Sequence, residues 1–429
     1  MQKIACIFSF QESNWVSCQK IVFNLHKSYQ GCQDVELRNF NFPHKLANQS
    51  SLDKLAQDIV SYAPDVLAII DHKPHPIILI QSLNSLYAGA KKPKIIFHLF
   101  GDFTIFYSQW EKLGPLLEGY PVEFVVASER QKILIDKMFL HNSCTICPFP
   151  VDPKDFYPDQ ELRKKQRQDW NLADEDVAFL FTGRLSRQKR IKTLITSFAS
   201  EFRNDSKAHL FLYGIQDNIG DLFLGIADLE GEYFRVFYNA YKALPEEIQN
   251  RIHFMGQVPN SELLKVYQGA DIFMNLSVHN DEDFGMSVAE AQFVGLSVGL
   301  TDWGGLASFD HADIPNSTSF IPVRIGKRSK QVSIPGAKKT MRNFYLTSQT
   351  GMRASISIAA NKKFGISKAT VIIEELLSKD SARFEGFTPL FKRVALASLI
   401  NPSTSIYLKS DLTLNQLYRD IYSSYVRNP

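Results

Sequence analysis

Two carboxylates frame a short loop and the start of a helix within residues 282–295, which read Glu-Asp-Phe-Gly-Met-Ser-Val-Ala-Glu-Ala-Gln-Phe-Val-Gly. The pattern places Glu282 in the loop and Glu290 at least one turn inside the helix, so both can face a ligand at the helix N-terminus. Free backbone N–H groups and the helix dipole favour negative charge there, and Gly285 lets the backbone approach a ligand closely. The segment predicts a diphosphate site; an acidic loop capping an ordinary surface helix is the alternative.

A second group of charged side chains follows a predicted strand at residues 177–182. The chain continues Gly-Arg-Leu-Ser-Arg-Gln-Lys from Gly183 to Lys189, so Arg184 and Lys189 leave the strand end together, with Arg187 between them. Ligands of parallel sheets gather at the carboxyl ends of strands, and cationic side chains pair there with phosphate oxygens. The loop predicts a phosphorylated ligand, with a solvated basic loop as the alternative.

Two Asp-Glu-Asp runs, at residues 174–176 and 281–283, have a spacing that can hold a divalent cation. Such carboxylate pairs are frequent by chance, and the first run lies in a charged turn before a predicted strand. Cys144 and Cys147 have redox or zinc spacing but lack a second pair, so we expect buried structural thiols. The sequence therefore predicts no metal ion and no cofactor.

One of three histidines in the first series of strands is a candidate functional residue. His98 ends a predicted strand, and an imidazole there could hydrogen-bond a ligand hydroxyl or a developing charge. A structural histidine is the alternative. His72 and His75 stand beside prolines and lack further ligands, so we expect them to be loop residues.

Hydrophobic periodicity places these residues on two alternating series of strands and helices. In the first series, strands are predicted at residues 4–10, 35–42, 66–71, 95–100, 122–127 and 145–147, with helices at 15–26, 52–62, 76–87 and 129–139. In the second, strands are predicted at residues 177–182, 209–213, 251–255, 271–276 and 297–301, with helices at 189–202, 261–268 and after Glu282. Alternation of this kind predicts an α/β fold with two doubly wound domains, each a parallel sheet with helices on both faces.

The proline-rich residues 148–158, followed by the charged residues 161–169, form the best candidate for a linker. The predicted domains cover residues 1–158 and 159–404, and a C-terminal helix lies within residues 405–429. A packing of this helix back toward the N-terminal domain is left open. A basic segment at about residues 323–383 is expected to be a solvated insertion, with a binding patch as the alternative.

The composition argues against several classes of protein. The 429 residues carry 48 Lys and Arg against 45 Asp and Glu, without a long basic run, so we expect no nucleic-acid partner. No apolar stretch reaches the ~18 residues of a membrane span, and the first residues predict a strand and not a signal peptide. Five cysteines do not describe a disulfide framework, which indicates a cytoplasmic protein. Weak peripheral association with the inner membrane face stays open.

The residues also carry a family resemblance. The loop from Gly183 to Lys189 resembles the G-R-x4-K element of group 1 retaining glycosyltransferases, and Glu282 to Glu290 resembles their E-x7-E signature. Three more stretches resemble family segments in the right order, at residues 253–264, 269–277 and 295–305. The resemblance implies a GT-B fold, in which two Rossmann-like domains face each other across a cleft. The N-terminal domain would then be the acceptor side, and the second would hold a nucleotide sugar.

The resemblance also implies roles for single residues. Four side chains would act on the reacting groups: Glu282 and His98 on the transferred sugar, and Arg184 and Lys189 on the donor diphosphate. The remaining residues would bind other parts of the donor. Gly183 is the glycine at the strand end, Val258 would lie by the base, and Glu290 would hydrogen-bond the ribose. The backbone at Phe284, Gly285 and Met286 would bind phosphate and sugar oxygens.

The implied activity is transfer of a sugar from a UDP- or GDP-sugar to a glycan, lipid-linked or other envelope-type acceptor, with retention and without a metal. Two alternatives remain: a non-catalytic nucleotide-sugar-binding or scaffold protein, and a sugar phosphorylase or nucleotide-sugar epimerase. The sequence departs from the family at three places. Residues 278–281 lengthen the loop before Glu282, Asp283 stands where Gly or Pro is common, and residues 10–15 replace a glycine-rich loop.

Overall fold

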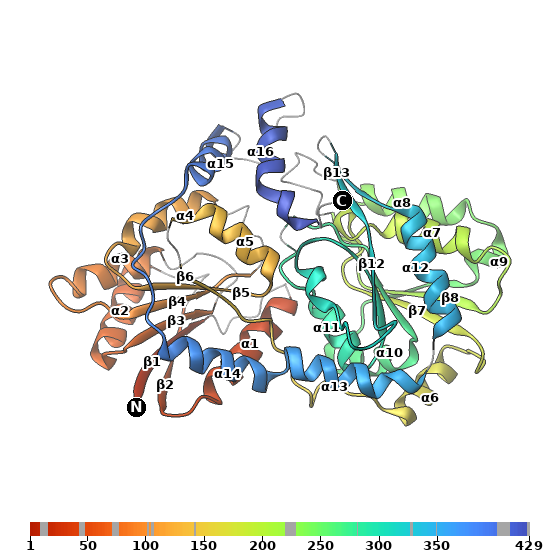
Figure 1. Cartoon of the computed structure of the whole chain (residues 1–429), viewed down its shortest axis with the longest axis horizontal. Helices are drawn as coiled ribbons and strands as arrows, with labels where there is room; N and C mark the ends of the chain where they lie inside the picture. Colours follow the sequence, from red (N-terminus) through yellow and green to blue (C-terminus); the bar gives the residue numbers. More distant parts are fainter. Residues whose placement is uncertain are drawn as a thin grey trace. The chain divides into compact units, whose positions relative to one another are not determined.

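The computed structural model describes residues 1–8, 16–42, 48–70, 77–100, 103, 107–140, 143–218, 229–280, 282–326, 329–348, 350–400 and 412–426. The chain divides into two compact units. The first contains Met1–Pro150 and Phe364–Ile406, and the second contains Val151–Lys363 and Tyr407–Pro429. Each unit has one six-stranded sheet (Figure 1).

The first unit is a doubly wound sheet. Its strands are β1 (Gln2–Phe8), β2 (Val35–Asn41), β3 (Val66–Ile70), β4 (Lys94–His98), β5 (Val122–Val126) and β6 (Ser143–Ile146). They run parallel in the order β2-β1-β3-β4-β5-β6. The central strands β3 and β5 are buried along their whole length, as expected for parallel strands covered on both faces.

Helices cover both faces of this sheet. They are α1 (Val16–Gln30), α2 (Gln49–Tyr62), α3 (Ile77–Leu86), α4 (Tyr107–Leu113), α5 (Glu129–Met138), α14 (Ile366–Ser378) and α15 (Pro389–Ile400). Figure 1 shows α1 and α14 along one face and α4 and α5 along the other. Helix α15 packs on α4 and α5.

The second unit has the strand order of nucleotide-binding doubly wound sheets. Its strands are β7 (Val177–Thr182), β8 (Ala208–Tyr213), β9 (Ile252–Gly256), β10 (Ile272–Asn275), β11 (Ser297–Thr301) and β12 (Thr318–Ile321). They run parallel in the order β12-β11-β10-β7-β8-β9. A separate antiparallel hairpin joins β13 (Val323–Gly326) to β14 (Ser329–Val332).

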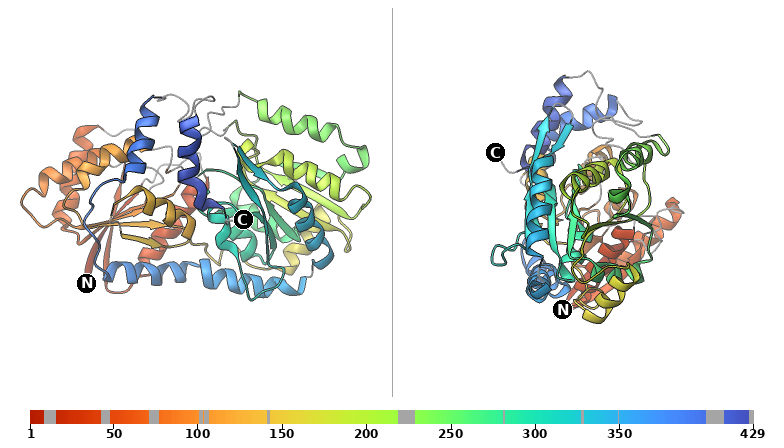
Figure 2. Two further views of the ribbon diagram at one scale, coloured as in Figure 1. Left: turned by 45° about the horizontal axis from the view of Figure 1, so that its top comes forward. Right: turned by 90° about the vertical axis from the view of Figure 1, so that its right-hand side faces the viewer.

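The second unit contains the following described α-helices. They are α6 (Gln160–Asp169), α7 (Ile191–Glu201), α8 (Glu232–Lys242), α9 (Glu246–Gln249), α10 (Leu263–Gly269), α11 (Met286–Phe293), α12 (Ile334–Thr347), α13 (Arg353–Phe364) and α16 (Leu412–Tyr422). Helix α7 lies between α8 and α12, as the left view of Figure 2 shows, while α6 packs on α10. None of the described helices has the length and apolar character that crossing a bilayer requires.

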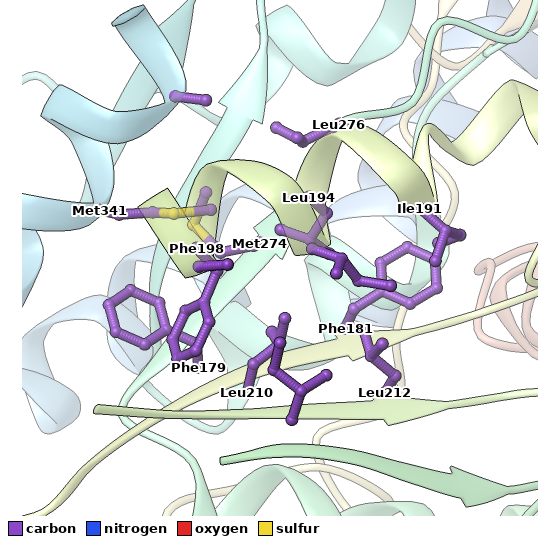
Figure 3. Close-up of a cluster of buried hydrophobic side chains, with 14 of the residues drawn as sticks. Phe179, Phe181, Ile191, Leu194, Phe198, Leu210, Leu212, Met274, Leu276 and Met341 are labelled. Carbon is purple, nitrogen blue, oxygen red and sulfur yellow. The ribbon is translucent and has the colours of Figure 1, made fainter. Parts of the chain in front are cut away.

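A buried apolar cluster joins α7 and α12 to the second sheet (Figure 3). Phe179 and Phe181 on β7 and Leu210 and Leu212 on β8 point into it. Phe198 of α7 packs edge-on against Phe179, with ring centroids 5.8 Å apart. The cluster fixes β7 relative to its neighbours, and the ends of these strands carry the charged residues discussed below.

The fold class predicted from the sequence is confirmed, and most predicted strands lie within two residues of the observed ones. The predicted division of the chain needs a correction, because residues 364–406 belong to the first unit. Helix α14 packs on α1, and the Glu374 carboxylate accepts a hydrogen bond from the Gln33 backbone at 2.8 Å. Lys94 donates to the Leu376 carbonyl at 2.6 Å. These partners lie more than 280 residues apart in the sequence, so no local pattern indicates them.

The basic segment at residues 323–383 is not a solvated insertion, so that prediction was wrong. Helices α12, α13 and α14 occupy most of it, and Met341 and Phe344 of α12 enter the buried cluster. Lys330 is only 3% exposed. The many basic residues of the segment hide the apolar periodicity of α12, an amphipathic helix whose apolar face is buried.

The C-terminal helix predicted within residues 405–429 is present as α16, followed by a 3-10 turn, η8 (Ser423–Tyr425). It is part of the second unit, where Tyr418, Tyr422 and Tyr425 are buried.

Helix α6 forms where the sequence predicts a charged linker. Its N-cap is Asp159, whose side chain accepts from the Leu162 backbone N–H at 3.0 Å. The buried face consists of Arg163, Gln166 and Arg167, so apolar periodicity is absent. Helix α6 therefore packs through the guanidinium groups of its buried arginines and not through apolar side chains.

These guanidinium groups converge on Asp271. Its carboxylate lies 2.5 Å from Arg163 and 3.1 Å from Arg167, and Arg353 lies 4.0 Å away. Burial, followed by the positive charges of Arg163 and Arg167, lowers the pKa of Arg353 to about 9. Asp271 therefore compensates several buried positive charges at the start of β10.

Replacing Asp271 with Asn should destabilise the protein by about 3–5 kcal/mol, because it leaves buried guanidinium groups without their carboxylate. Urea unfolding followed by circular dichroism measures the change.

The matched control is Asp136→Asn, which removes an exposed carboxylate 2.6 Å from Lys132 on the same helical face. It should cost about 0.3–0.5 kcal/mol. Equal losses in the two variants would contradict a special role for Asp271.

Candidate functional site

The strand order of the second sheet reverses between β7 and β10. Ligands of doubly wound sheets bind beyond the carboxyl ends of the strands at such a reversal. The loops that follow these two strands are joined here, because the Val278 backbone N–H donates to the Gln188 carbonyl at 3.0 Å. The fold therefore selects one edge of one sheet as the candidate site.

Lys189, Ser277 and Glu282 meet at this edge. Lys189 ends a 3-10 turn, η3 (Arg187–Lys189), that follows β7. Its Nζ lies 2.8 Å from Oε2 of Glu282 and 3.3 Å from Oγ of Ser277, and the Ser277 hydroxyl donates to the same Glu282 oxygen. Glu282 is 7% exposed. The loop after β7 and the loop after β10 thus share one ion pair.

The charge state of Glu282 follows from two opposed effects. Burial acts most strongly on the carboxyl group and would raise its pKa. The positive charge of Lys189, then that of His279, and the hydrogen bonds from Lys189 and Ser277 together outweigh burial, so the pKa of Glu282 lies below its usual value. The carboxylate is therefore ionised at neutral pH, despite its burial.

Helix α11 begins immediately after this loop. Gly285 caps it with a φ of 123°, a conformation that favours glycine, and a Cβ here would lie 2.8 Å from Cδ2 of Leu306. Phe284 and Met286 on either side are buried, and Phe284 packs on Phe309. Because both side chains lie in the core, the backbone is the part of these residues that a ligand could use, as the resemblance implies.

Glu290 is tied to the end of β7 by a buried tyrosine. The Tyr267 hydroxyl donates to Oε2 of Glu290 at 3.0 Å and is 2.7 Å from Oγ1 of Thr182, the last residue of β7. Glu290 is 5% exposed. Glu282 and Glu290 therefore approach the carboxyl end of β7 through different partners.

Arg184 pairs with Asp217, a residue of the loop after β8. The two loops are held together by the Leu185 backbone N–H, which donates to the Ile215 carbonyl at 2.8 Å. Gly183 has a φ of 143°, so the chain turns sharply out of β7 before Arg184. Arg184 is about one-third exposed, whereas Asp217 is 17% exposed.

Val258, predicted to lie near the base, follows the edge strand β9 and is partly exposed. It is two strands away from β7, so the structure does not bring it into the cluster of Lys189, Ser277 and Glu282. Its role stays a prediction.

Sequence reasoning missed three residues of this site: Ser277, Tyr267 and Asp217. Ser277 and Asp217 follow the ends of β10 and β8 by a few residues, which is the signal that strand-end reasoning could have used. Tyr267 gives no such signal, because it lies within α10 and reaches Glu290 only in the folded chain.

His98 lies in the first unit, at the end of β4, with 3% of its surface exposed. The Tyr29 hydroxyl is 2.9 Å from its Nε2. Burial lowers the pKa of His98 to about 3, and burial is also the main cause that raises the pKa of Tyr29 well above its ordinary value. A neutral imidazole and a protonated tyrosine therefore share a buried hydrogen bond. This arrangement favours the structural alternative that the sequence leaves open.

Among the described residues, no three His, Cys, Asp or Glu side chains converge as metal ligands do. Asp176 accepts from the Ala173 backbone at 2.8 Å, and Asp283 is 6% exposed. Cys144 and Cys147 are free thiols, and burial raises the pKa of Cys147 to about 12. Asp281, His72, His75 and residues 10–15 lie outside the described residues.

Comparison with known proteins points to the same part of the chain. Residues 163–309 match the model of the family Glycosyl transferases group 1. These residues contain both loops of the candidate site and the two glutamates. No curated protein matches the chain.

Solved structures show a likeness over most of the chain. Anabaena HepE in complex with UDP and glucose is 15% identical, with 88% of this chain and 100% of that one covered and a TM-score of 0.59. Sucrose-phosphate synthase from Thermosynechococcus elongatus is 14% identical, with 88% and 98% covered and a TM-score of 0.60. A glycosyltransferase from Rickettsia africae is 15% identical, with 88% and 99% covered and a TM-score of 0.57.

The two sheets and these likenesses define the fold as GT-B, with two Rossmann-like units. Within that fold, the family match is confined to the second unit, the unit that holds Lys189, Glu282 and Glu290.

The burial of His98 predicts a pH effect on stability. Above pH 6.5 the imidazole is neutral in both states, so it has no effect. Between pH 6.5 and about 3 the unfolded chain binds a proton that the folded chain does not, so stability falls by about 1.4 kcal/mol per pH unit as the pH decreases.

Replacing His98 with Gln removes this proton, so the loss of unfolding free energy between pH 6.5 and pH 5 should be about 2 kcal/mol smaller than in the wild type. Urea unfolding at both pH values measures it. An equal loss of unfolding free energy in the two proteins would show that His98 is not buried in its neutral form.

Proposed function

We propose that this protein is a glycosyltransferase that moves a sugar from a nucleoside diphosphate sugar to an acceptor. One observation carries the proposal: the cations and carboxylates meet where the strand order of the second sheet reverses, inside the segment that matches the family model. Neither the fold nor the charges alone would be sufficient, because doubly wound sheets support many functions.

Arg184, Lys189 and the N-terminus of α11 would hold the donor diphosphate. Breaking the bond between the sugar and the diphosphate builds negative charge on the leaving group, and fixed cations with a helix N-terminus stabilise that charge without reorganising. HepE, with a similar fold, was solved with UDP and glucose, which supports a uridine donor over a guanosine one.

Glu282 would act on the transferred sugar and Glu290 on the ribose. An ionised Glu282 can accept hydrogen bonds from sugar hydroxyls or balance positive charge that develops at the reacting carbon. Its Oε2 already accepts from Lys189 and Ser277, so its orientation is set before a substrate arrives. Preorganisation of this kind is what makes an electrostatic group effective.

Retention of configuration, independence of metal and an acceptor of the glycan, lipid-linked or envelope type complete the proposal. The family resemblance supports the first two, and it makes the first unit the side that would bind the acceptor.

The second candidate is a non-catalytic protein that binds a nucleotide sugar. One observation favours it: His98, which the resemblance directs at the transferred sugar, is buried and bonded to Tyr29. The test is release of UDP or GDP from a panel of UDP- and GDP-sugars, incubated with glycan and lipid-linked acceptors. Binding of a nucleotide sugar without release of a nucleotide would refute the catalytic proposal and support this candidate.

Replacing Lys189 with Met should lower kcat/KM by about 10²–10³-fold, the usual cost of removing one donor to a developing negative charge. The initial rate of UDP or GDP release measures it.

The control is Lys207→Met. Lys207 lies on the surface of the same unit, 3.8 Å from Glu175, and its loss should leave the rate within about two-fold, as for an exposed ion pair. Equal activity of the Lys189 and Lys207 variants would show that Lys189 does not stabilise the leaving group.

Excess EDTA should leave the rate of nucleotide release unchanged, because the charged side chains replace a metal in the proposed chemistry. Recovery of a lost rate on adding Mg²⁺ or Mn²⁺ would instead show that an Asp-Glu-Asp run binds a cation.

A further inference from the structure

The loop that carries Glu282 is covered by the C-terminal segment of the chain, residues 412–426. Tyr418 and Tyr422 of α16 and Tyr425 of η8 are each at most 1% exposed. Trp303, which follows β11, packs against Tyr422 and Tyr425 with ring centroids 6.0 Å and 5.5 Å apart. The last helix is therefore part of the core beside the candidate site.

Polar contacts connect this aromatic cluster to Asn280, two residues before Glu282. Oδ1 of Asn280 accepts from Nζ of Lys330 at 2.6 Å and from the Tyr418 hydroxyl at 3.1 Å. The Lys330 ammonium also lies 5.3 Å from the centre of the Trp303 ring and 6.0 Å from that of Tyr418. Lys330 is 3% exposed and Asn280 is 4% exposed, so these bonds are shielded from water and correspondingly strong.

A second connection reaches the backbone of Glu282 itself. The Gly305 N–H donates to the Glu282 carbonyl at 2.6 Å. A Cβ on Gly304 would lie 2.6 Å from that carbonyl oxygen and 3.3 Å from the Tyr425 ring. The Tyr425 ring and the Glu282 backbone both pack against Gly304. This close packing is possible because Gly304 has a φ of 52° and no side chain.

We propose that Tyr418 and Lys330 are positioning residues that act through Asn280 to fix the loop of Glu282, and that the C-terminal segment serves this purpose. The proposal rests on the proposed function, in which Glu282 contacts the transferred sugar. Residues 278–281 lengthen the loop, and a longer loop needs more contacts to hold one conformation. Tyr418 of the C-terminal segment and Lys330 of β14 supply them.

The conservative variant is Tyr418→Phe, which removes one hydroxyl and keeps the ring. It should lower kcat by roughly 3- to 10-fold, the effect of losing one hydrogen bond, and leave the Kd for UDP within about two-fold, because Arg184 and Lys189 hold the diphosphate. In a Glu282→Gln background the same change should have no further effect on kcat, since coupled residues are not additive.

The matched control is Tyr62→Phe in the first unit. The Tyr62 hydroxyl donates to the Glu36 carbonyl at 2.6 Å, so the control also removes a tyrosine hydrogen bond, and kcat should not change. Should Tyr418→Phe fail to fold, Lys330→Met removes the other donor to Asn280 and has the same expected outcome. An equal loss of kcat in the presence and absence of Glu282 would overturn the proposal.

Hydrogen exchange separates this proposal from the proposed function, because it needs no turnover. The Gly305 amide, bonded to the Glu282 carbonyl, and the amides of residues 278–285 should exchange faster in Tyr418→Phe than in the wild type and in Tyr62→Phe. Unchanged exchange would overturn the positioning role even in an active enzyme. Faster exchange in a protein without transferase activity would keep the positioning role and refute the proposed function alone.

Discussion

A carboxylate stays ionised inside a protein only when a positive charge and hydrogen bonds replace the water it has lost. The pair of Lys189 and Glu282 meets this condition where the strand order of the second sheet reverses. Each partner comes from a different loop, so neither loop can move without leaving a charge buried. Lys189 ends η3, and Glu282 lies between β10 and α11, so the ion pair joins these two segments of the site.

Close backbone approach is the second constraint, and it depends on glycine. Gly285 permits the turn into α11, and Gly304 and Gly305 bring the chain after β11 against the backbone of Glu282 and Asp283. The aromatic residues of the C-terminal segment close the other side of Gly304. The Lys189 ammonium holds the Glu282 side chain, and the glycines let neighbouring segments pack against the Glu282 backbone. The loop is therefore fixed by two independent kinds of contact.

Local patterns explain what could be predicted from the sequence. The predicted bounds of β7 and β11 match the observed ones. For β7 the reason is plain, because its apolar run ends at Gly183 and a charged loop follows directly. Helix α6 has no apolar face and was missed, since its buried side chains are arginines that depend on Asp271, more than 100 residues later. Residues 364–406 and 412–426 were misassigned or left open for the same reason: their partners are distant in the sequence.

The two ion pairs of the site differ in a way that bears on the proposed chemistry. The side chains of Lys189 and Glu282 are 16% and 8% exposed, whereas those of Arg184 and Asp217 are 33% and 17% exposed. Screening by water weakens the more exposed pair, so a diphosphate bound as we propose would separate Arg184 from Asp217 at lower cost than Lys189 from Glu282. In the proposed function, Arg184 would therefore exchange its carboxylate for the donor phosphate. Lys189 would reach the phosphate while keeping Glu282 in place for the sugar.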